Sequence, residues 1–202
     1  MERREIIAWR KEKRAQLIEA RMALTSAAHN AASAEIGKRL MTLFAPRSRT
    51  LVGAYWPFRR EYNVLAFLEW LTERRHEVAL PVVLGKGQPL EFRRWTRDME
   101  MASGVYDIPY PSRGEPVRPS ILVIPTVGFD DACYRLGYGG GFYDRTIASY
   151  AEKPLCIGVG FELGHLGTIH PLAHDIPMDW IATGQALYRR GADCGVTIQP
   201  AP

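Results

Sequence analysis

Two continuous apolar runs constrain the fold of this chain more than any other feature. The segments SILVIP (120–125) and LCIGVGF (155–161) contain no charged side chain, which is typical of strands buried on both faces of a sheet. TLVGAYW (50–56), EVALPVV (77–83) and LEFRRW (90–95) are further strand candidates, because they are rich in β-branched or aromatic residues. Segments typical of helices separate several of these runs, so the sequence predicts an α/β fold with a mainly parallel sheet.

The helical segments are recognised by their periodicity and by the residues at their ends. They cover residues 5–24, 24–44, 63–75 and 143–152. Thr25 or Ser26 is the predicted N-cap of the second helix, and Asn63 is that of the third. The clearest apolar stripe, in the third helix, consists of Leu65, Leu68 and Leu71. Residues 109–119 are rich in proline and predict a connector.

The length of 202 residues is enough for one domain with its own core. We expect a single domain over 1–187 and a weakly structured C-terminal extension over 188–202. The longest uncharged apolar stretch has 11 residues, whereas a membrane helix needs about 20, and the N-terminus lacks the apolar run of a signal peptide. The three cysteines show no Cys-x-x-Cys spacing, which fits a reducing compartment. We therefore expect a cytoplasmic protein without a membrane partner.

The positive charge of the chain is concentrated near its N-terminus. The formal net charge is +4, and residues 1–25 contain seven Lys or Arg and four Glu. A basic helix of this kind can contact nucleic acid, an anionic membrane or the phosphates of a small ligand, or it can simply be a solvated surface. No basic patch with interleaved aromatic residues follows elsewhere, so we expect no nucleic-acid partner.

The segment RLGYGGGFYDR (135–145) carries the strongest indication of a binding site. Four glycines fall within five of its positions, and Arg135 and Arg145 frame them. Glycine permits positive φ and a close approach of backbone N–H groups to an anion, while arginine grips phosphate oxygens through a planar fork. The segment is not a Walker A loop and fits the dinucleotide fingerprint poorly. A phosphate-binding loop and a tight structural turn are both compatible with it.

Nearby carboxylates indicate a possible metal site. Asp144 lies in the first turn of the helix predicted after the glycines, and Asp175 belongs to HDIPMD, with Asp179 four residues later. Magnesium typically binds one or two protein carboxylates and completes its shell with water and phosphate oxygens. A magnesium site is one interpretation of these residues, and surface salt bridges or helix capping are the other.

The glycine segment and its surroundings resemble those of a known family. The segment VIPTVGFDDACYRLGYGGGFYDR (123–145) is similar to that of the 5-formyltetrahydrofolate cyclo-ligases, also called methenyltetrahydrofolate synthetases. The similarity extends to YWPFRREYNV (55–64), the basic N-terminal helix, His174, Asp175, Asp179 and residues 181–183. It spans residues 4–183, and the glycine motif is its most specific part. The fold it implies is α/β, a three-layer αβα domain around a mainly parallel sheet.

The resemblance also implies a particular reaction. The family uses ATP and Mg²⁺ to phosphorylate the formyl oxygen of 5-formyltetrahydrofolate. N10 then attacks the activated carbon, and loss of phosphate leaves 5,10-methenyltetrahydrofolate, ADP and phosphate. For this chain we therefore expect ATP and Mg²⁺ as cofactors and a reduced folate, with or without a polyglutamate tail, as the small-molecule substrate. We expect a monomer or a weak homodimer.

The family motif assigns the glycine segment to ATP. The ATP loop would comprise Arg135, Leu136, Gly137, Tyr138, Gly139, Gly140, Gly141, Phe142 and Tyr143. Its middle, from Tyr138 to Phe142, would also line the folate pocket. The catalytic candidates are Arg135, Tyr143 and Arg145.

The resemblance places further groups at the two ends of the substrates. Asp144 and Asp175 would bind Mg²⁺. Trp56 and Glu61 would contact the pterin end. Trp offers a stacking face, and a carboxylate accepts two hydrogen bonds from an amino-pyrimidine edge.

The N-terminal pattern of the family departs slightly in this chain. The family has a lysine four residues before an arginine, and both meet ATP phosphates. Here the arginine falls on Arg14, and Arg10 occupies the lysine position, with Lys11 as an alternative lysine beside it. A spacing of four places Arg10 and Arg14 on one helix face.

Two other functions fit parts of the sequence. A metal-dependent phosphohydrolase would use His165, His170, His174 and Asp175, although Pro171 disfavours a helical ligand pair and the glycine segment would have no role. A non-catalytic nucleotide- or sugar-phosphate-binding domain would use the glycines and arginines, but not the pair of Asp144 and Asp175.

Overall fold

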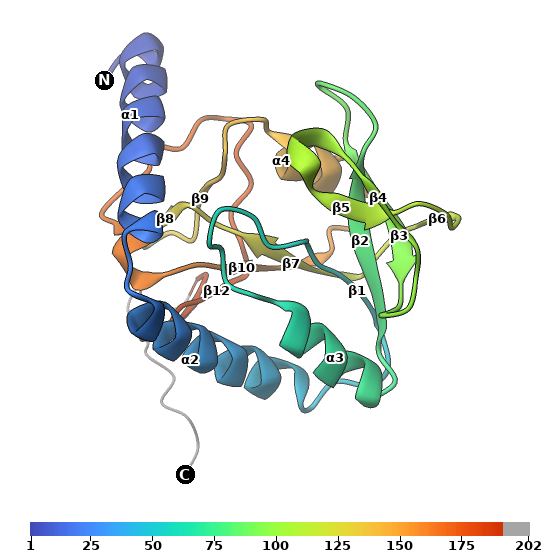
Figure 1. Ribbon diagram of the computed structural model, residues 1–202. Helices are drawn as coiled ribbons and strands as arrows, with labels where there is room; N and C mark the ends of the chain where they lie inside the picture. Colours follow the sequence, from blue (N-terminus) through green and yellow to red (C-terminus); the bar gives the residue numbers. More distant parts are fainter. Residues whose placement is uncertain (192–202) are drawn as a thin grey trace.

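The computed structural model describes residues 1–191. Within them, an eight-stranded sheet runs through the molecule (Figure 1). In spatial order its strands are β13 (Leu187–Arg189), β12 (Trp180–Ala182), β10 (Leu155–Val159), β7 (Ile121–Pro125), β1 (Leu51–Gly53), β2 (Glu77–Val83), β3 (Leu90–Trp95) and β6 (Pro116–Val117). The neighbouring strands from β12 to β2 are parallel, and β13, β3 and β6 pair antiparallel at the two edges. The predicted mainly parallel sheet is therefore confirmed.

Helices cover both faces of this sheet. α2 (Ser26–Phe44) and α3 (Leu65–Glu73) lie along one face, and α4 (Phe142–Ala148) lies on the other (Figure 1). Alternate residues of a strand point to opposite faces. Val123 of β7 accordingly joins α2 and α3 in one apolar cluster, whereas Leu122 joins α4 in another, and both are fully buried. The chain thus has the expected three-layer αβα architecture, with a separate core on each face.

A small three-stranded sheet connects the main sheet to the N-terminal helix. Its strands are β11 (His165–Leu166), β8 (Gly128–Asp130) and β9 (Arg135–Leu136). α1 (Arg3–Met22) packs here through Leu17, in a cluster with Val127, Leu136 and Ile169. The β8–β9 hairpin therefore stands between the buried strand β7 and the glycine loop. No helix in residues 1–191 is long and apolar enough to cross a membrane.

The helix ends largely follow their predicted caps. The Thr25 hydroxyl accepts a hydrogen bond of 3.2 Å from the Ala28 N–H, so Thr25 is the N-cap of α2. Val64 is the N-cap of α3, one residue later than expected, although the Asn63 side chain still accepts from the Leu65 N–H at 3.2 Å. α4 ends at Ala148 rather than near residue 152. Ser149 caps this end, because its N–H and its hydroxyl both donate to carbonyls of the preceding turn.

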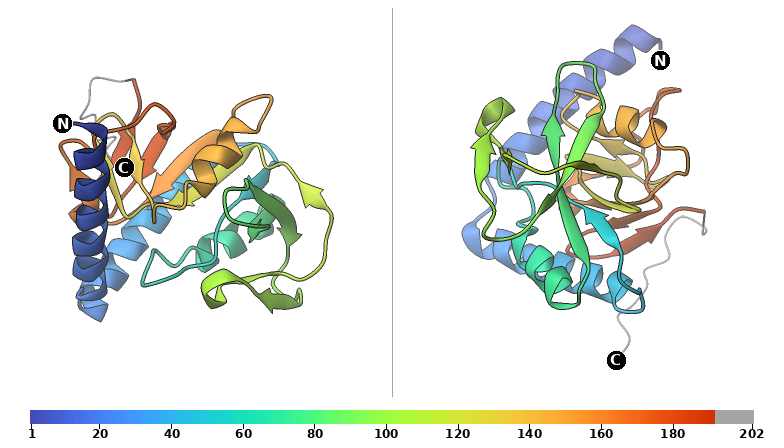
Figure 2. Two further views of the ribbon diagram at one scale, coloured as in Figure 1. Left: turned by 90° about the horizontal axis from the view of Figure 1, so that it is seen from above. Right: turned by 90° about the vertical axis from the view of Figure 1, so that its right-hand side faces the viewer.

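Some elements differ from the sequence-based expectation. The strand predicted over 50–56 is shorter in the structure, where β1 covers only Leu51–Gly53. The proline-rich connector contains β5 (Pro109–Pro111), which pairs with β4 (Met101–Ser103), and also β6. The β4–β5 hairpin lies on the opposite side of the molecule from α1 (Figures 1 and 2). The expected extension over 188–202 was placed too early, since β13 pairs with β12, and its remainder from 192 onward lies outside the described residues.

Candidate functional site

A cavity of about 820 Å³ opens at the carboxyl ends of the parallel strands. Its lining includes Tyr55 and Trp56, which follow β1, Val83 at the end of β2 and Pro125 at the end of β7. β1 lies between β2 and β7, so the strand order reverses here. Ligands of open α/β sheets bind at such a reversal. The volume of this cavity is that of a small-molecule pocket.

One wall of the cavity is the basic helix α1. Arg3, Arg10, Lys11 and Arg14 all line it. Arg10 donates two hydrogen bonds to Asp175, Nη1 to Oδ2 at 2.8 Å and Nη2 to Oδ1 at 3.2 Å, and both side chains are buried. Asp175 Oδ2 also accepts from the Leu172 N–H at 2.6 Å. The ion pair therefore fixes the loop that carries Asp175 against the helix.

Arg14 faces the glycine loop. Its Nε is buried and has no hydrogen-bond partner among residues 1–191. Its Cζ lies 3.3 Å from the position that a Cβ on Gly139 would occupy. Burial, and then the neighbouring charge of Arg10, lower the pKa of Arg14, while Asp175 raises it. A guanidinium with unused donors beside backbone N–H groups is well suited to an anionic ligand.

The glycine loop needs its glycines at specific positions. Gly139 (φ +93°) and Gly141 (φ +64°) are both left-handed. A Cβ on Gly141 would lie 2.8 Å from Arg145 Nη1, and a Cβ on Gly140 would lie 2.8 Å from the Phe142 ring. Gly137 and residues 138–143 line the cavity, as expected for a ligand-binding loop.

Two predicted loop residues do not line the cavity. Leu136 is fully buried in the cluster beneath α1, because β9 pairs it into the small sheet. Arg145 turns back along α4 and donates to the Gly140 carbonyl, so it supports the loop in this structure. The binding role of Leu136 and the catalytic role of Arg145 remain predictions.

Asp144 and Asp175 both accept hydrogen bonds from backbone N–H groups of the segment 172–176. Asp144 Oδ1 accepts from the Ile176 N–H at 3.1 Å, and Oδ2 pairs with Arg135 Nη2 at 2.9 Å. Arg135 also donates to the Ile176 carbonyl at 3.1 Å. Both carboxylates line the cavity, but residues 1–191 contain no group of three His, Cys, Asp or Glu side chains that could hold a metal. This donor set fits a magnesium ion shared with phosphate oxygens, not a site built from protein ligands alone.

Asp179 lies outside this arrangement. It pairs with Lys153 at 2.8 Å and accepts from the Cys156 N–H at 2.8 Å, which fixes the start of β10. It does not line the cavity.

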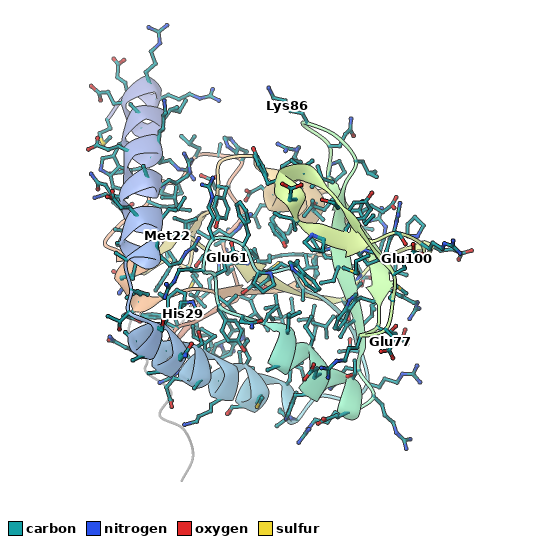
Figure 3. The ribbon with its side chains drawn as sticks, viewed as in Figure 1. Met22, His29, Glu61, Glu77, Lys86 and Glu100 are labelled. Carbon is teal, nitrogen blue, oxygen red and sulfur yellow. The ribbon has the colours of Figure 1, made fainter. Side chains whose placement is uncertain are left out.

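The other end of the cavity is aromatic and contains one buried carboxylate. Glu61 is 5% exposed and lies in the interior between α1 and the sheet (Figure 3). It accepts from the Phe58 N–H at 2.9 Å. Burial raises the pKa of Glu61 to about 7, against the opposing effects of this N–H, Arg21 and Tyr138. The centre of the Phe58 ring lies 6.2 Å from that of Tyr106 and 6.0 Å from that of Tyr138, so this end of the cavity gathers aromatic faces on which a planar heterocycle can stack.

Sequence reasoning missed part of this end. Gly104, Val105, Tyr106, Ile108 and Tyr110 also line the cavity, from the β4–β5 hairpin. This segment borders the expected connector, and Tyr106 has φ +61°, for which a tyrosine gives no sequence signal. Arg21 of α1 was also missed, although its spacing of seven from Arg14 places both on one helix face.

The histidines considered for a phosphohydrolase do not form a common site. His165 pairs with Asp131 at 2.7 Å and stacks on Phe129. His170 packs against the Trp9 ring at 4.8 Å. Only His174 lines the cavity, so the residues expected for that activity are not brought together.

These features define an α/β protein with a cavity for small molecules at the carboxyl edge of its sheet. The sequence model of the 5-formyltetrahydrofolate cyclo-ligase family matches residues 6–184, and the chain therefore belongs to that family of ligases. The 5-formyltetrahydrofolate cyclo-ligase of Haemophilus influenzae is 27% identical over 182 residues, which cover 87% of this chain and 97% of the relative.

Solved structures are similar as well. The NMR structure of Aquifex aeolicus 5,10-methenyltetrahydrofolate synthetase superposes with a TM-score of 0.78 at 25% identity, covering 94% of this chain and 96% of that one. The structure of a 5,10-methenyltetrahydrofolate synthetase from Mycoplasma pneumoniae has a TM-score of 0.73 at 22% identity and covers 87% and 98%. The second likeness bears on the fold alone.

The glycine loop gives a stability prediction. Gly139→Ala forces a side chain into a left-handed position beside Arg14, so it should lower the free energy of unfolding by about 1–2 kcal/mol. Gly137→Ala is the matched control, because nothing lies within 4 Å of its Cβ position and its φ is not positive. It should be neutral or stabilising by about 0.5 kcal/mol. Urea unfolding measures both, and equal effects of the two changes would contradict this account of the loop.

Glu61 gives a pH-dependent prediction. The native pKa of about 7 lies above the ordinary value of 4.5, so native stability is lost as pH rises from 4.5 to 7. Glu61→Gln removes this loss and keeps an acceptor for the Phe58 N–H. At pH 8 the free energy of unfolding of Glu61→Gln should exceed that of the wild type by about 1–3 kcal/mol, and at pH 5 this difference should nearly vanish. The exposed Glu73→Gln is the control; a Glu61→Gln effect independent of pH refutes the assignment.

Proposed function

We propose that this protein converts 5-formyltetrahydrofolate to 5,10-methenyltetrahydrofolate with ATP and Mg²⁺, releasing ADP and phosphate through a phosphorylated formyl intermediate. The observation that carries the proposal is a single cavity with two chemically different ends. One end has basic side chains and the glycine loop, and the other has aromatic rings and Glu61. Membership of the cyclo-ligase family supports the reaction.

The basic end is assigned to the ATP phosphates. Arg14 and the N–H groups of the glycine loop would bind them, with Lys11 exposed at the same wall. Arg10 fills the position of the family lysine, and its Nε is buried without a partner among residues 1–191. We therefore assign to Arg10 a double role, in which it fixes Asp175 and adds positive charge at the phosphates.

Asp144 and Asp175 are assigned to Mg²⁺. When bound, the ion neutralises phosphate charge and so lowers the barrier to phosphoryl transfer. Arg135 holds Asp144 in place and contributes a further positive charge to the cavity wall.

The aromatic end is assigned to the pterin. The Glu61 carboxylate would accept hydrogen bonds from the amino-pyrimidine edge, and Trp56 and Tyr106 would offer stacking faces. Burial raises the pKa of Tyr143 well above its ordinary value, so its hydroxyl stays protonated and available as a donor near the reacting formyl group.

The chemistry requires positioning and charge neutralisation rather than a protein nucleophile. The formyl oxygen attacks the γ-phosphorus, and ADP leaves. N10 then attacks the activated carbon and loses its proton, and departure of phosphate completes the methenyl bridge. The residues of this chain hold the two substrates in line, with the formyl group between the glycine loop and the pterin site.

Several further expectations accompany this function. We infer a reduced folate as substrate, with or without a polyglutamate tail, and a monomer or weak homodimer in the cytoplasm. The family match over residues 6–184 supports one domain.

Formation of the methenyl product, measured by its near-ultraviolet absorbance, tests the proposal. Wild-type protein with 5-formyltetrahydrofolate should produce it only when ATP and Mg²⁺ are both present. Asp144→Asn should lower the rate by about 100-fold or more while the protein remains folded, because a carboxylate assigned to Mg²⁺ is lost. Asp98→Asn, an exposed loop change away from the cavity, should be unaffected. ATP binding without product would instead favour a non-catalytic nucleotide-binding domain.

A further inference from the structure

The turn that carries Glu61 is strained. Arg59 (φ +46°) and Arg60 (φ +55°) are consecutive left-handed residues, although neither is glycine. A left-handed backbone is unfavourable for a residue with a side chain, so a turn of this kind persists only where its surroundings hold it. The turn is closed by a hydrogen bond of 3.0 Å from the Glu61 N–H to the Phe58 carbonyl.

Contacts from the first two helices hold this turn from outside. Arg21 Nε donates to the Arg59 carbonyl at 3.0 Å. His29 Nε2 lies 3.1 Å from the Arg60 carbonyl oxygen, and Arg60 Nη2 donates to the Leu24 carbonyl at 2.9 Å. Figure 3 shows His29 at the start of α2, below Glu61.

Arg21 makes a second contact, on the glycine loop. Its Nη2 donates to the Tyr138 hydroxyl at 2.5 Å, and its guanidinium lies 5.9 Å from the centre of the Tyr138 ring. The Tyr138 hydroxyl in turn acts on Glu61 and lowers the pKa of its carboxyl group. Arg21 is 3% exposed and does not line the cavity. One buried guanidinium thus joins the strained turn to the glycine loop without itself reaching the cavity.

Arg21 also sets the electrostatic surroundings of Glu61. The titratable groups that act on Glu61 are Arg21 of α1, Tyr138 of the glycine loop, Tyr143 of α4, and Tyr55 after β1. Arg21 is the cation among them, and it lowers the pKa of Glu61 against the effect of burial. Without Arg21, a larger fraction of Glu61 would be protonated at neutral pH and would lose one acceptor oxygen.

We propose that Arg21 is a positioning residue for the folate end of the cavity, which fixes Glu61 and Tyr138 in one arrangement and keeps Glu61 an acceptor. The proposal rests on the proposed function for the identity of the ligand. It predicts an effect on folate rather than on ATP, since Arg21 contacts the turn and Tyr138 but not Arg10 or Arg14.

Two substitutions separate the hydrogen bonds of Arg21 from its charge. Arg21→Met removes the hydrogen bonds and the charge but keeps a side chain of similar length. Arg21→Lys keeps a positive charge, but an ammonium cannot reach the Arg59 carbonyl and Tyr138 as the guanidinium fork does. Arg4→Met is the matched control, because Arg4 is an exposed cation of the same helix and does not line the cavity.

Steady-state kinetics across pH test the proposal. Arg21→Met should raise KM for 5-formyltetrahydrofolate by about 10–100-fold, keep KM for ATP within about twofold, and move the acid limb of kcat/KM upward by about one pH unit. Arg21→Lys should raise KM for the folate but leave the acid limb near that of the wild type. Arg4→Met should change neither. Equal losses for both substrates, or an unchanged folate KM, would overturn the proposal.

A second measurement does not depend on turnover. In urea unfolding at pH 8, the effects of Arg21→Met and Glu61→Gln should be non-additive by about fivefold or more in the unfolding equilibrium constant, because the Arg21 charge acts on Glu61 and Arg21 holds the turn that carries it. Additive effects would overturn the coupling of Arg21 to Glu61. If the wild type shows no turnover but the coupling is present, the proposed function fails and the positioning role of Arg21 stands.

Discussion

The structure depends on basic side chains that α1 turns inward rather than toward water. Arg10 and Arg21 are buried, and Arg14 lies on the same face of the helix. Buried cations need partners, and each of these reaches a different segment. Arg10 pairs with Asp175, Arg21 holds the turn before Glu61, and Arg14 faces the glycine loop. One helix therefore brings together three parts of the chain that are far apart in sequence.

The sheet explains why those three parts meet at one place. The strand order reverses at β1, so the segments that follow β1 and β7 diverge around the same opening. The turn with Glu61 comes from the first of these segments, and the glycine loop follows the β8–β9 hairpin after the second. The aromatic and basic ends of the cavity then belong to one opening, as the proposed reaction between a folate and a nucleotide requires.

Much of this could be predicted from the sequence, because apolar runs and glycine-rich segments have local causes. Most of the predicted segment 120–125 forms β7 (Ile121–Pro125), whose two faces are both buried, and Asp144 lies in the first turn of α4 as expected. Side-chain direction could not be predicted, since it depends on tertiary packing. Leu136 points into the core through its pairing in β9, and Arg145 folds back on its own loop.

We infer that Arg14, which is half-buried and whose Nε has no hydrogen-bond partner among residues 1–191, is left incompletely paired in order to bind phosphate. Calorimetric titration of MgATP into the wild type and Arg14→Gln, together with urea unfolding of both, tests it most directly. We expect Arg14→Gln to raise the Kd for ATP by about 10–100-fold while the free protein becomes no less stable, because a half-buried and incompletely paired cation has been removed. An unchanged affinity for ATP with a clear loss of stability would contradict it.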